Sequence, residues 1–344
     1  MKIFNKIILY LNVLVAIFTI FSYLSPYINP AKFWIFSFFG LAFPYLILLN
    51  FVFFIYWLFN KKRYSLLSLV IIFIGYQNIN DFIVFNKSKP GEENKSISIM
   101  SYNVNQGYFL DKNKIKFNIL SRFIDNQKAD ILLLQEKNTK RINKELQDLT
   151  NYPYRNSIKG KGAAIFSRFP IVSKGEINFN STTNSCLWAD IAIDSDTLRI
   201  YSVHFMSNQI SRPAEAIVND MESDGKLESK NIKAILSKYK RYVQVRAEQV
   251  LKVLANISKS PYPVIIGGDF NDPPSSFTYH KFNEKFKDAF KETGNGLGIT
   301  YAGVIPMLRI DYLFFSKDIV INDFETIKVK YSDHFPIKAG FSIH

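Results

Sequence analysis

Polar side chains that could bind a cation or move a proton stand at the ends of several apolar runs in this sequence. The run VIIGGDFNDPP (Val264–Pro274) places Asp269 and Asn271 after a stretch of branched apolar residues. The side chains at such endings are Asn103, Asn105, Gln135, Glu136, His204, Asp269, Asn271, Asp311, Asp333 and His334. Carboxylate and carboxamide oxygens are the donors that Mg²⁺ prefers, and Mg²⁺ keeps positions for water or substrate phosphate, so the set indicates metal-assisted chemistry on a phosphate.

Each of these signals also has an ordinary structural explanation. Asn103 could be a turn residue, Glu136 a charged strand end, and GDFND a turn closed by Asx hydrogen bonds. Together they are more specific, because six such endings in one chain rarely arise by chance and two of the four histidines lie within them. A zinc site is not indicated, since Cys186 is the only cysteine and the two histidines are far apart in sequence.

The elements that must position these side chains are short strands. Runs such as SISIMSYNV, CLWADIAID and LRIYSVHF have β-type composition, and several are apolar almost throughout, as expected when both faces of a sheet are covered. Apolar residues at three- and four-residue spacing predict helices over 115–126 and about 229–258. Two packed sheets flanked by helices are therefore expected, and alternation along a strand would point Asp269 and Asn271 to the same side.

The N-terminal quarter of the chain is strongly apolar. Uncharged runs predict membrane-spanning helices over 7–27 and 34–59, because each run exceeds the roughly 20 residues that cross a bilayer. A cleavable signal is disfavoured, since a second long run follows at once and no small-residue cleavage site is evident. A third span is predicted over 64–80, with an interfacial helix as the alternative because polar residues dilute its far end.

Basic residues around these runs indicate an orientation. Lys2, Lys6 and the KKR segment at 61–63 would face the cytoplasm under the positive-inside rule. Three spans then predict a multi-pass protein of a bacterial-type inner or plasma membrane with an extracytoplasmic catalytic domain, whereas two spans would leave that domain inside. The predicted organisation is an anchor over 1–86, a Pro/Gly/charged linker over 87–95 and a catalytic domain over 96–344.

The motifs SYNV, LLQE, the VH of SVHF, GDFN, RIDY and SDHFP together resemble the endonuclease/exonuclease/phosphatase superfamily. The similarity covers about Ser96–His344, and GDFN with SDHFP is its most specific part. The resemblance implies an α/β (α+β) four-layer sandwich, in which two mixed sheets pack face to face with helices outside. In this chain the sandwich would be preceded by an all-α transmembrane anchor.

The resemblance also implies a metal site. Glu136 corresponds to the main ligand of Mg²⁺, for which Mn²⁺ is the alternative, and Asn103 lies beside it. Asp333 would lie near the metal. Asn105 departs from the pattern, because some endonuclease relatives carry a carboxylate there.

The same resemblance assigns catalytic roles. Asp269 would orient or deprotonate the attacking water, and Asn271 would hydrogen-bond the scissile phosphate. His334 would stabilise charge on the phosphoryl oxygens or act as an acid, with Asp311 fixing its tautomer. His204 would be a second histidine facing the phosphate or the leaving group, although the sequence offers no evident carboxylate partner for it.

Three functions follow from these expectations. The first is a membrane-anchored phosphodiesterase or phosphatase that acts on a lipid headgroup or a small phosphorylated molecule. The second is an anchored nuclease, and the third is a catalytically idle membrane protein that only binds. The net charge of +14 suits phospholipid, phosphorylated substrates or nucleic acid as partners, and equally a solubilising surface. The sequence does not indicate an oligomeric state.

Overall fold

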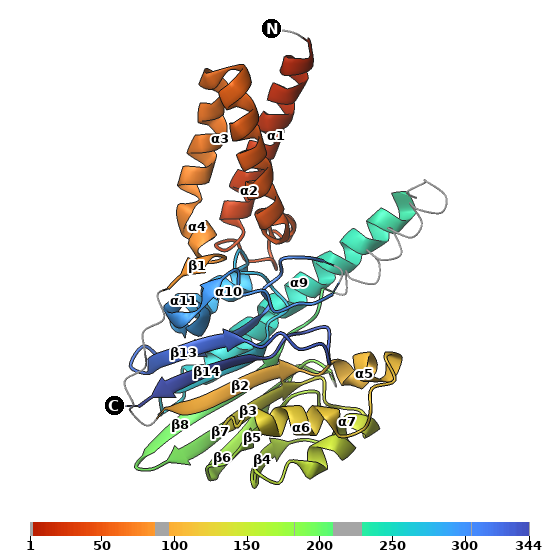
Figure 1. The fold of residues 1–344 in the computed structure, drawn as a ribbon, viewed down its shortest axis with the longest axis vertical. Coiled ribbons are helices and arrows are strands. Elements are labelled where there is room, and N and C mark those ends of the chain that lie inside the picture. The colour runs from red at the N-terminus through yellow and green to blue at the C-terminus, as the bar shows by residue number, and fades with distance from the viewer. Residues whose placement is uncertain (1–2, 87–95, 182, 209–228, 304, 344) are drawn as a thin grey trace.

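The chain forms a helical bundle that stands on a sandwich of two β-sheets (Figure 1). The computed structural model describes residues 3–86, 96–181, 183–208, 229–303 and 305–343. The linker predicted over 87–95 lies outside these residues. Short strands β1 (Val84–Phe85) and β11 (Asn295–Gly296) pair where the bundle meets the sandwich.

Four helices make up the N-terminal bundle, namely α1 (Ile3–Leu24), α2 (Ile35–Asn60), α3 (Lys62–Ile74) and α4 (Tyr76–Asn80). The first helix ends at Leu24 and not at residue 27, because Pro26 disfavours helical backbone angles at Ser25, the residue before it. The predicted helix over 64–80 is divided at Gly75. A Cβ at Gly75 would lie 2.2 Å from the hydroxyl oxygen of Tyr23, so glycine leaves the room that Tyr23 occupies.

The first sheet, called sheet I, is mixed. In spatial order its strands are β13 (Val320–Thr326), β14 (Ile337–Ser342), β2 (Ile97–Asn103), β3 (Ile131–Gln135), β5 (Ala164–Ser167) and β4 (Tyr154–Ser157). Strands β2 and β3 are parallel and the other neighbours are antiparallel. The parallel pair brings the ends of two motif strands, Asn103 and Gln135, into register.

The second sheet, sheet II, has the same plan. In spatial order its strands are β10 (Lys287–Asp288), β12 (Asp311–Phe315), β9 (Val264–Asp269), β8 (Asp196–His204), β7 (Ser185–Ile193) and β6 (Ile171–Ile177). Strands β8 and β9 are parallel and the other neighbours are antiparallel.

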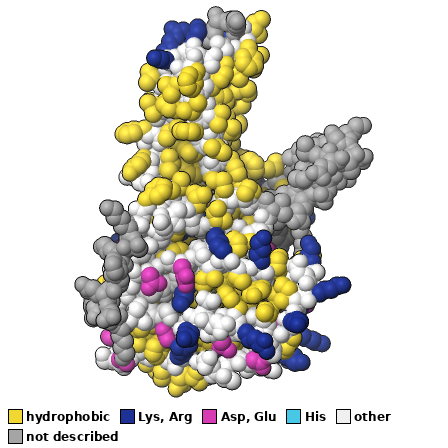
Figure 2. Space-filling view, viewed as in Figure 1, with side chains coloured by type: hydrophobic (Ala, Val, Ile, Leu, Met, Phe, Trp, Pro, Cys, Tyr) yellow, Lys and Arg dark blue, Asp and Glu magenta, His cyan; other side chains and the backbone are white. Residues whose placement is uncertain are grey.

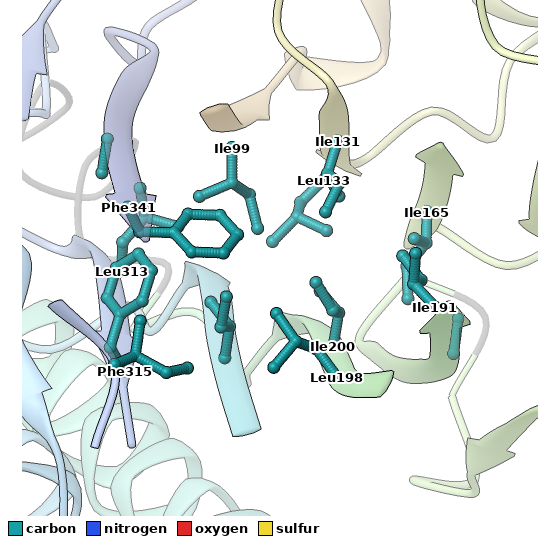
Figure 3. Packing of buried hydrophobic residues seen from close by; sticks show 14 of the residues in the cluster. Ile99, Ile131, Leu133, Ile165, Ile191, Leu198, Ile200, Leu313, Phe315 and Phe341 are labelled. Atoms are coloured by element: carbon teal, nitrogen blue, oxygen red, sulfur yellow. The ribbon is translucent and has the colours of Figure 1, made fainter. Parts of the chain in front are cut away.

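The two sheets pack face to face around a buried apolar core. Ile99, Leu133 and Phe341 of sheet I meet Ile200 and Leu313 of sheet II there (Figure 3). Burying such side chains contributes about 1.5–3 kcal/mol each.

Helices cover the outer faces of both sheets. Sheet I packs against α6 (Ile119–Asn126) and α7 (Lys140–Glu145), and sheet II against α9 (Ser229–Ile257) and α10 (Phe277–Asn283). The other helices in the described part of the chain are η1 (Asn105–Gly107), α5 (Tyr108–Lys112), η2 (Leu146–Asp148) and α11 (Ala289–Thr293). The prediction of two mixed sheets flanked by helices is confirmed.

Candidate functional site

Three adjacent strands of sheet II bring His204, Asp269 and Asp311 together. His204 pairs with Asp269 across the parallel β8–β9 ladder, and Asp311 pairs with Asp269 across the antiparallel β12–β9 ladder. Gly268 makes this arrangement feasible, because its φ of +145° lies where other residues are strained and a Cβ would sit 1.9 Å from the carbonyl oxygen of Val203. All three functional side chains are buried.

Asn271 meets Asp269 through a turn and not through strand alternation. Strand β9 ends at Asp269, and Asn271 has a φ of +54°. Its backbone N–H donates to Asp269 Oδ1 at 2.8 Å, and its side-chain Nδ2 donates to Asp269 Oδ2 and to the Phe205 carbonyl, both at 3.0 Å. Asp269 and Asn271 do lie together, as expected, but strand alternation was the wrong reason, because an Asx turn places the two side chains together.

Asn103 links the two sheets at the site. Its Nδ2 donates to Asp269 Oδ2 at 2.9 Å and to Glu136 Oε1 at 3.3 Å, while its Oδ1 accepts from the Asn105 N–H at 2.9 Å. Glu136 follows strand β3 with a φ of +56°, and its carboxylate remains partly exposed. Asn103 thus connects a carboxylate from each sheet.

A histidine–aspartate pair lies beside these residues. His334 precedes β14 in sheet I, and its Nδ1 lies 2.9 Å from Asp311 Oδ2 in sheet II, while its Nε2 lies 3.8 Å from Asp269 Oδ2. Burial lowers the pKa of His334, but the charges of Asp311, Asp269 and Asp333 outweigh burial and hold that pKa well above its usual value. The pair therefore favours an imidazolium that presents Nε2 to the cluster.

His204 is held by a backbone carbonyl, which explains why the sequence offers no carboxylate partner. Its Nδ1 lies 3.2 Å from the Thr183 carbonyl oxygen. Its Nε2 is buried, has no hydrogen-bond partner among the described residues, and lies 3.5 Å from Glu136 Oε1 and 3.6 Å from Asp269 Oδ2. A buried polar atom without a partner marks a position where a bound group belongs.

Asp333 lies at the border of the cluster, with the Ser332 side chain between it and Asn103. Its Oδ1 is 3.3 Å from the Ser332 hydroxyl, which donates to the Asn103 carbonyl oxygen at 2.7 Å. Among the described residues, no hydrogen bond joins the Asp333 carboxylate directly to Glu136 or to the Asn103 side chain. Seven of the eight predicted site residues therefore form one connected cluster, and Asp333 borders it through Ser332.

Burial also raises the pKa of Asp269, against the lowering influence of His334 and His204. Three hydrogen bonds to its two oxygens, from Asn103 and from the backbone and side chain of Asn271, favour the ionised form. Asp269 is thus a desolvated carboxylate facing two imidazoles.

Sequence reasoning missed Gln106. It lies in η1 with a φ of +54°, and its Nε2 donates to Glu136 Oε2 at 3.2 Å. Its backbone N–H donates to the Glu136 carbonyl oxygen at 3.0 Å. In the sequence, only the position of Gln106 in the NQ dipeptide directly after SYNV indicates that it could lie near the site.

Arg246 was also missed, because the helix predicted over about 229–258 was given no part in the site. Its guanidinium is fully buried and makes two 2.9 Å hydrogen bonds to the Asp272 carboxylate. It also donates to the Met206 carbonyl oxygen at 2.6 Å and to Asn208 Oδ1 at 2.7 Å. Arg246 therefore ties together the loops that follow His204 and Asp269.

The donor set fits a divalent cation. The carboxylates of Glu136 and Asp269 converge beside the buried His204 Nε2, which has no hydrogen-bond partner among the described residues. Asn103 directs its Nδ2 at both carboxylates, while its Oδ1, the atom that could bind a cation, accepts from the Asn105 N–H. One ligand atom each from Asp269, Asp311 and His334 also lie within 4.8 Å of one another. In the latter group the Asp311–His334 hydrogen bond already uses one polar atom of each residue. The Glu136 carboxylate is partly exposed, which favours Glu136 as the main holder of a metal, with Asn103 beside it.

Similarity to solved structures covers the sandwich and shows its fold. An endonuclease/exonuclease/phosphatase family protein from Bacteroides thetaiotaomicron is 17% identical with a TM-score of 0.53, over 73% of this chain and 98% of that one. A mannosyl-6-phosphatase from the same species is 18% identical with a TM-score of 0.52, over 72% and 100%. TDP2 from D. rerio, complexed with a single-strand DNA product, is 17% identical with a TM-score of 0.52, over 72% and 100%.

Family models divide the chain between its two parts. Residues 5–82 match a model described as a domain of unknown function (DUF8431). A search of curated proteins finds no match. Residues 100–334, which include the whole cluster, match the endonuclease/exonuclease/phosphatase family. The chain therefore belongs to the endonuclease/exonuclease/phosphatase family of phosphoester hydrolases.

Proposed function

We propose that this protein is a membrane-anchored, Mg²⁺-dependent phosphoester hydrolase whose substrate is a lipid headgroup or another small phosphorylated molecule. The observation that carries this proposal is the single buried cluster in which carboxylates, carboxamides and two histidines converge from both sheets. Hydrolysis of a phosphoester requires a positioned water, neutralisation of phosphoryl charge and help for the leaving group. The cluster contains groups suited to each task.

Glu136 and Asn103 would hold the cation, with Asp333 bordering the site. When bound, Mg²⁺ or Mn²⁺ would neutralise charge on the phosphoryl oxygens. Gln106 keeps the Glu136 carboxylate oriented through its 3.2 Å hydrogen bond. The partial exposure of Glu136 leaves its carboxylate accessible from solvent.

Asp269 is placed to orient an attacking water and to take its proton. Its Oδ2 is held by Asn103 and Asn271 and faces the Nε2 atoms of both histidines. Both side-chain N–H groups of Asn271 are engaged within the protein, so Asn271 acts here by fixing Asp269. A direct hydrogen bond from Asn271 to phosphate requires one of these bonds to be exchanged.

His334 and His204 face the phosphate from the two sides of Asp269. Asp311 keeps the proton of His334 on Nδ1, so the second ring N–H is available to a phosphoryl oxygen or a leaving group. The carbonyl of Thr183 accepts from a proton on Nδ1 of His204, which leaves Nε2, without a hydrogen-bond partner among the described residues, directed at the cluster. General acid–base assistance of this kind contributes typically about 10²- to 10⁴-fold in rate.

The exposure pattern of the bundle supports a membrane anchor. Helices α1 and α2 are long and apolar enough to cross a bilayer, and only 28% and 22% of their most apolar windows are buried. Phe59 is 85% exposed and Phe73 is 80% exposed. Figure 2 shows apolar side chains over the bundle and basic ones at its far end. A core helix of a soluble protein would instead hide its apolar surface.

The interior of the bundle contains polar contacts between helices beside a buried apolar cluster. Asn12 Nδ2 donates to Ser68 Oγ at 2.8 Å, and Trp57 Nε1 donates to Asn12 Oδ1 at 3.1 Å. Asn50 Nδ2 donates to Thr19 Oγ1 at 2.8 Å. Buried polar contacts between helices and apolar outer surfaces are typical of helix packing in lipid.

For the topology, we propose three crossings and an extracytoplasmic catalytic domain in a bacterial-type inner or plasma membrane. The far end of the bundle carries Lys61, Lys62 and Arg63, which the positive-inside rule assigns to the cytoplasm. Helices α3 and α4 together run from residue 62 to 80, which corresponds to about 28 Å of helix. That length approaches the roughly 30 Å of a hydrocarbon core.

Full-length protein in detergent micelles would test the function directly. We expect Mg²⁺-dependent hydrolysis of a phosphomonoester or a phospholipid headgroup, lost on addition of EDTA. Asp269→Ala and His334→Ala should each lower kcat by at least about 100-fold with little change in Tm, and Arg168→Ala, outside the cluster, serves as the control. Hydrolysis that persists in EDTA or in either variant would contradict the mechanism, and cleavage restricted to an oligonucleotide would indicate a nuclease.

A further inference from the structure

Two of the contacts between the bundle and the sandwich involve segments that adjoin the site. At the first, Ser275 Oγ donates to the Gly40 carbonyl oxygen of α2 at 2.6 Å. The contact is close because a Cβ at Gly40 would lie 2.7 Å from the Ser275 carbonyl oxygen. Ser275 is buried and lies three residues after Asp272, in the loop that follows the Asx turn at Asp269.

The second contact lies where the bundle ends. The Asp81 carboxylate is 2.5 Å from Lys291 Nζ, and the Asp81 carbonyl oxygen accepts from Arg309 Nη2 at 2.8 Å. Arg309 is 1% exposed, and its Nη1 donates to Asp288 Oδ2 at 2.7 Å. The guanidinium also packs over the ring of Phe290, 4.6 Å from its centroid.

Arg309 lies close in the sequence to the Asp311–His334 pair. It stands two residues before Asp311, which holds His334. The Tyr312 hydroxyl lies 2.7 Å from the Arg309 carbonyl oxygen and 2.8 Å from the Asp272 carbonyl oxygen, so the two contacted segments meet at one side chain.

We propose that Asp81 and Arg309 are positioning residues, through which the N-terminal bundle holds the Asp311–His334 pair in its catalytic arrangement. The bundle is then part of the catalytic scaffold as well as an anchor. This inference rests on the proposed function for its kinetic consequence, because a misplacement of about 1 Å at a reacting group can cost roughly 100-fold in rate.

The test uses full-length protein in detergent micelles. Asp81→Ala and Lys291→Ala each break the ion pair that fixes Asp81, and with it the Asp81 carbonyl oxygen that accepts from Arg309. Arg168→Ala is the matched control, because it breaks an ion pair of similar exposure with Asp130 at the opposite end of strand β3. Two readouts are compared: kcat with KM on a phosphoester, and the imidazole N–H resonance of His334 in ¹⁵N-histidine-labelled protein.

We expect both junction variants to lower kcat by about 2- to 30-fold with KM little changed, because neither residue lies in the site. The double variant should be no worse than the more affected single variant, and Asp81→Glu should restore part of the loss. The His334 resonance should shift in the junction variants and stay in place in Arg168→Ala.

Unchanged kcat and an unchanged His334 resonance in both junction variants would overturn the inference. An equal loss of kcat in Arg168→Ala would do the same, since it would indicate a general effect on stability. If wild-type protein hydrolyses no phosphoester, the proposed function fails, and the resonance alone still decides whether the junction positions His334.

Discussion

The buried Arg246–Asp272 pair gives the sharpest quantitative prediction. Arg246→Met removes four hydrogen bonds and leaves the Asp272 carboxylate buried, with Thr278 Oγ1 at 2.6 Å as a remaining donor. Breaking a buried ion pair by removing one partner costs about 3–5 kcal/mol. One kcal/mol lowers Tm by about 2–4 °C in a domain of roughly 150–250 residues, so the expected loss is about 6–20 °C.

The measurement is the Tm of full-length protein in detergent, followed by tryptophan fluorescence or circular dichroism. The control is Arg168→Met, which breaks the half-exposed pair with Asp130 and should cost at most about 1 kcal/mol. The double variant Arg246→Met with Asp272→Asn should be more stable than Arg246→Met alone, because it removes the stranded charge. A loss of less than about 2 °C for Arg246→Met, or a double variant less stable than the single one, would refute the reasoning.

The same pair sets a pH dependence with a definite sign. Burial raises the pKa of Asp272, and Arg246 lowers it. A carboxyl group whose pKa is higher in the folded than in the unfolded state destabilises the fold once ionised, and this cost is relieved as pH falls through the folded pKa. In Arg246→Met the largest opposing influence is lost and only hydrogen bonds from Thr278 and Ser276 still lower the Asp272 pKa, so the Tm deficit relative to wild type should shrink between about pH 8 and pH 5. A deficit that grows over that interval would contradict this sign.

Three further predictions concern the metal, the backbone and the membrane. Glu136→Gln should raise the Mg²⁺ concentration for half-maximal activity by at least about tenfold, because even the loss of a residue that only hydrogen-bonds a metal ligand lowers metal affinity by about 10- to 100-fold. An unchanged metal titration would exclude Glu136 as a ligand. Gly268→Ala should lower the free energy of unfolding by more than about 1–3 kcal/mol, because backbone strain adds to a clash with the Val203 carbonyl oxygen. The control is Gly160→Ala, where φ is +79° and the space is open, so that only backbone strain is introduced. Equal losses of Tm in the two variants would argue against the clash. Reporter fusions after Asn86 should be active only outside the cytoplasm, and cytoplasmic activity would eliminate three crossings.

Much of the candidate site could be predicted from the sequence because its residues terminate apolar runs. Polar residues at the ends of these runs were expected to converge. The parallel pairs place Asn103 beside Gln135 in sheet I and His204 beside Asp269 in sheet II. The Asp311–His334 pair followed from the resemblance of RIDY and SDHFP to one family. Gln106 and Arg246 escaped this reasoning, because their partners are set by long-range contacts that leave no periodic pattern.

The sequence by itself determined the alternation of buried strands and covering helices, the apolar N-terminal runs and the polar residues that end each strand. These are properties of local composition and spacing, which act through the burial of apolar surface and the need to satisfy backbone hydrogen bonds. Only the tertiary structure decided that an Asx turn sets Asn271, that a carbonyl at Thr183 orients His204, and that Asp81 is joined to Lys291. These three contacts join segments that are far apart in the chain or depend on backbone angles that the side-chain pattern does not specify. Such contacts and angles become fixed only when the two sheets and the bundle pack together.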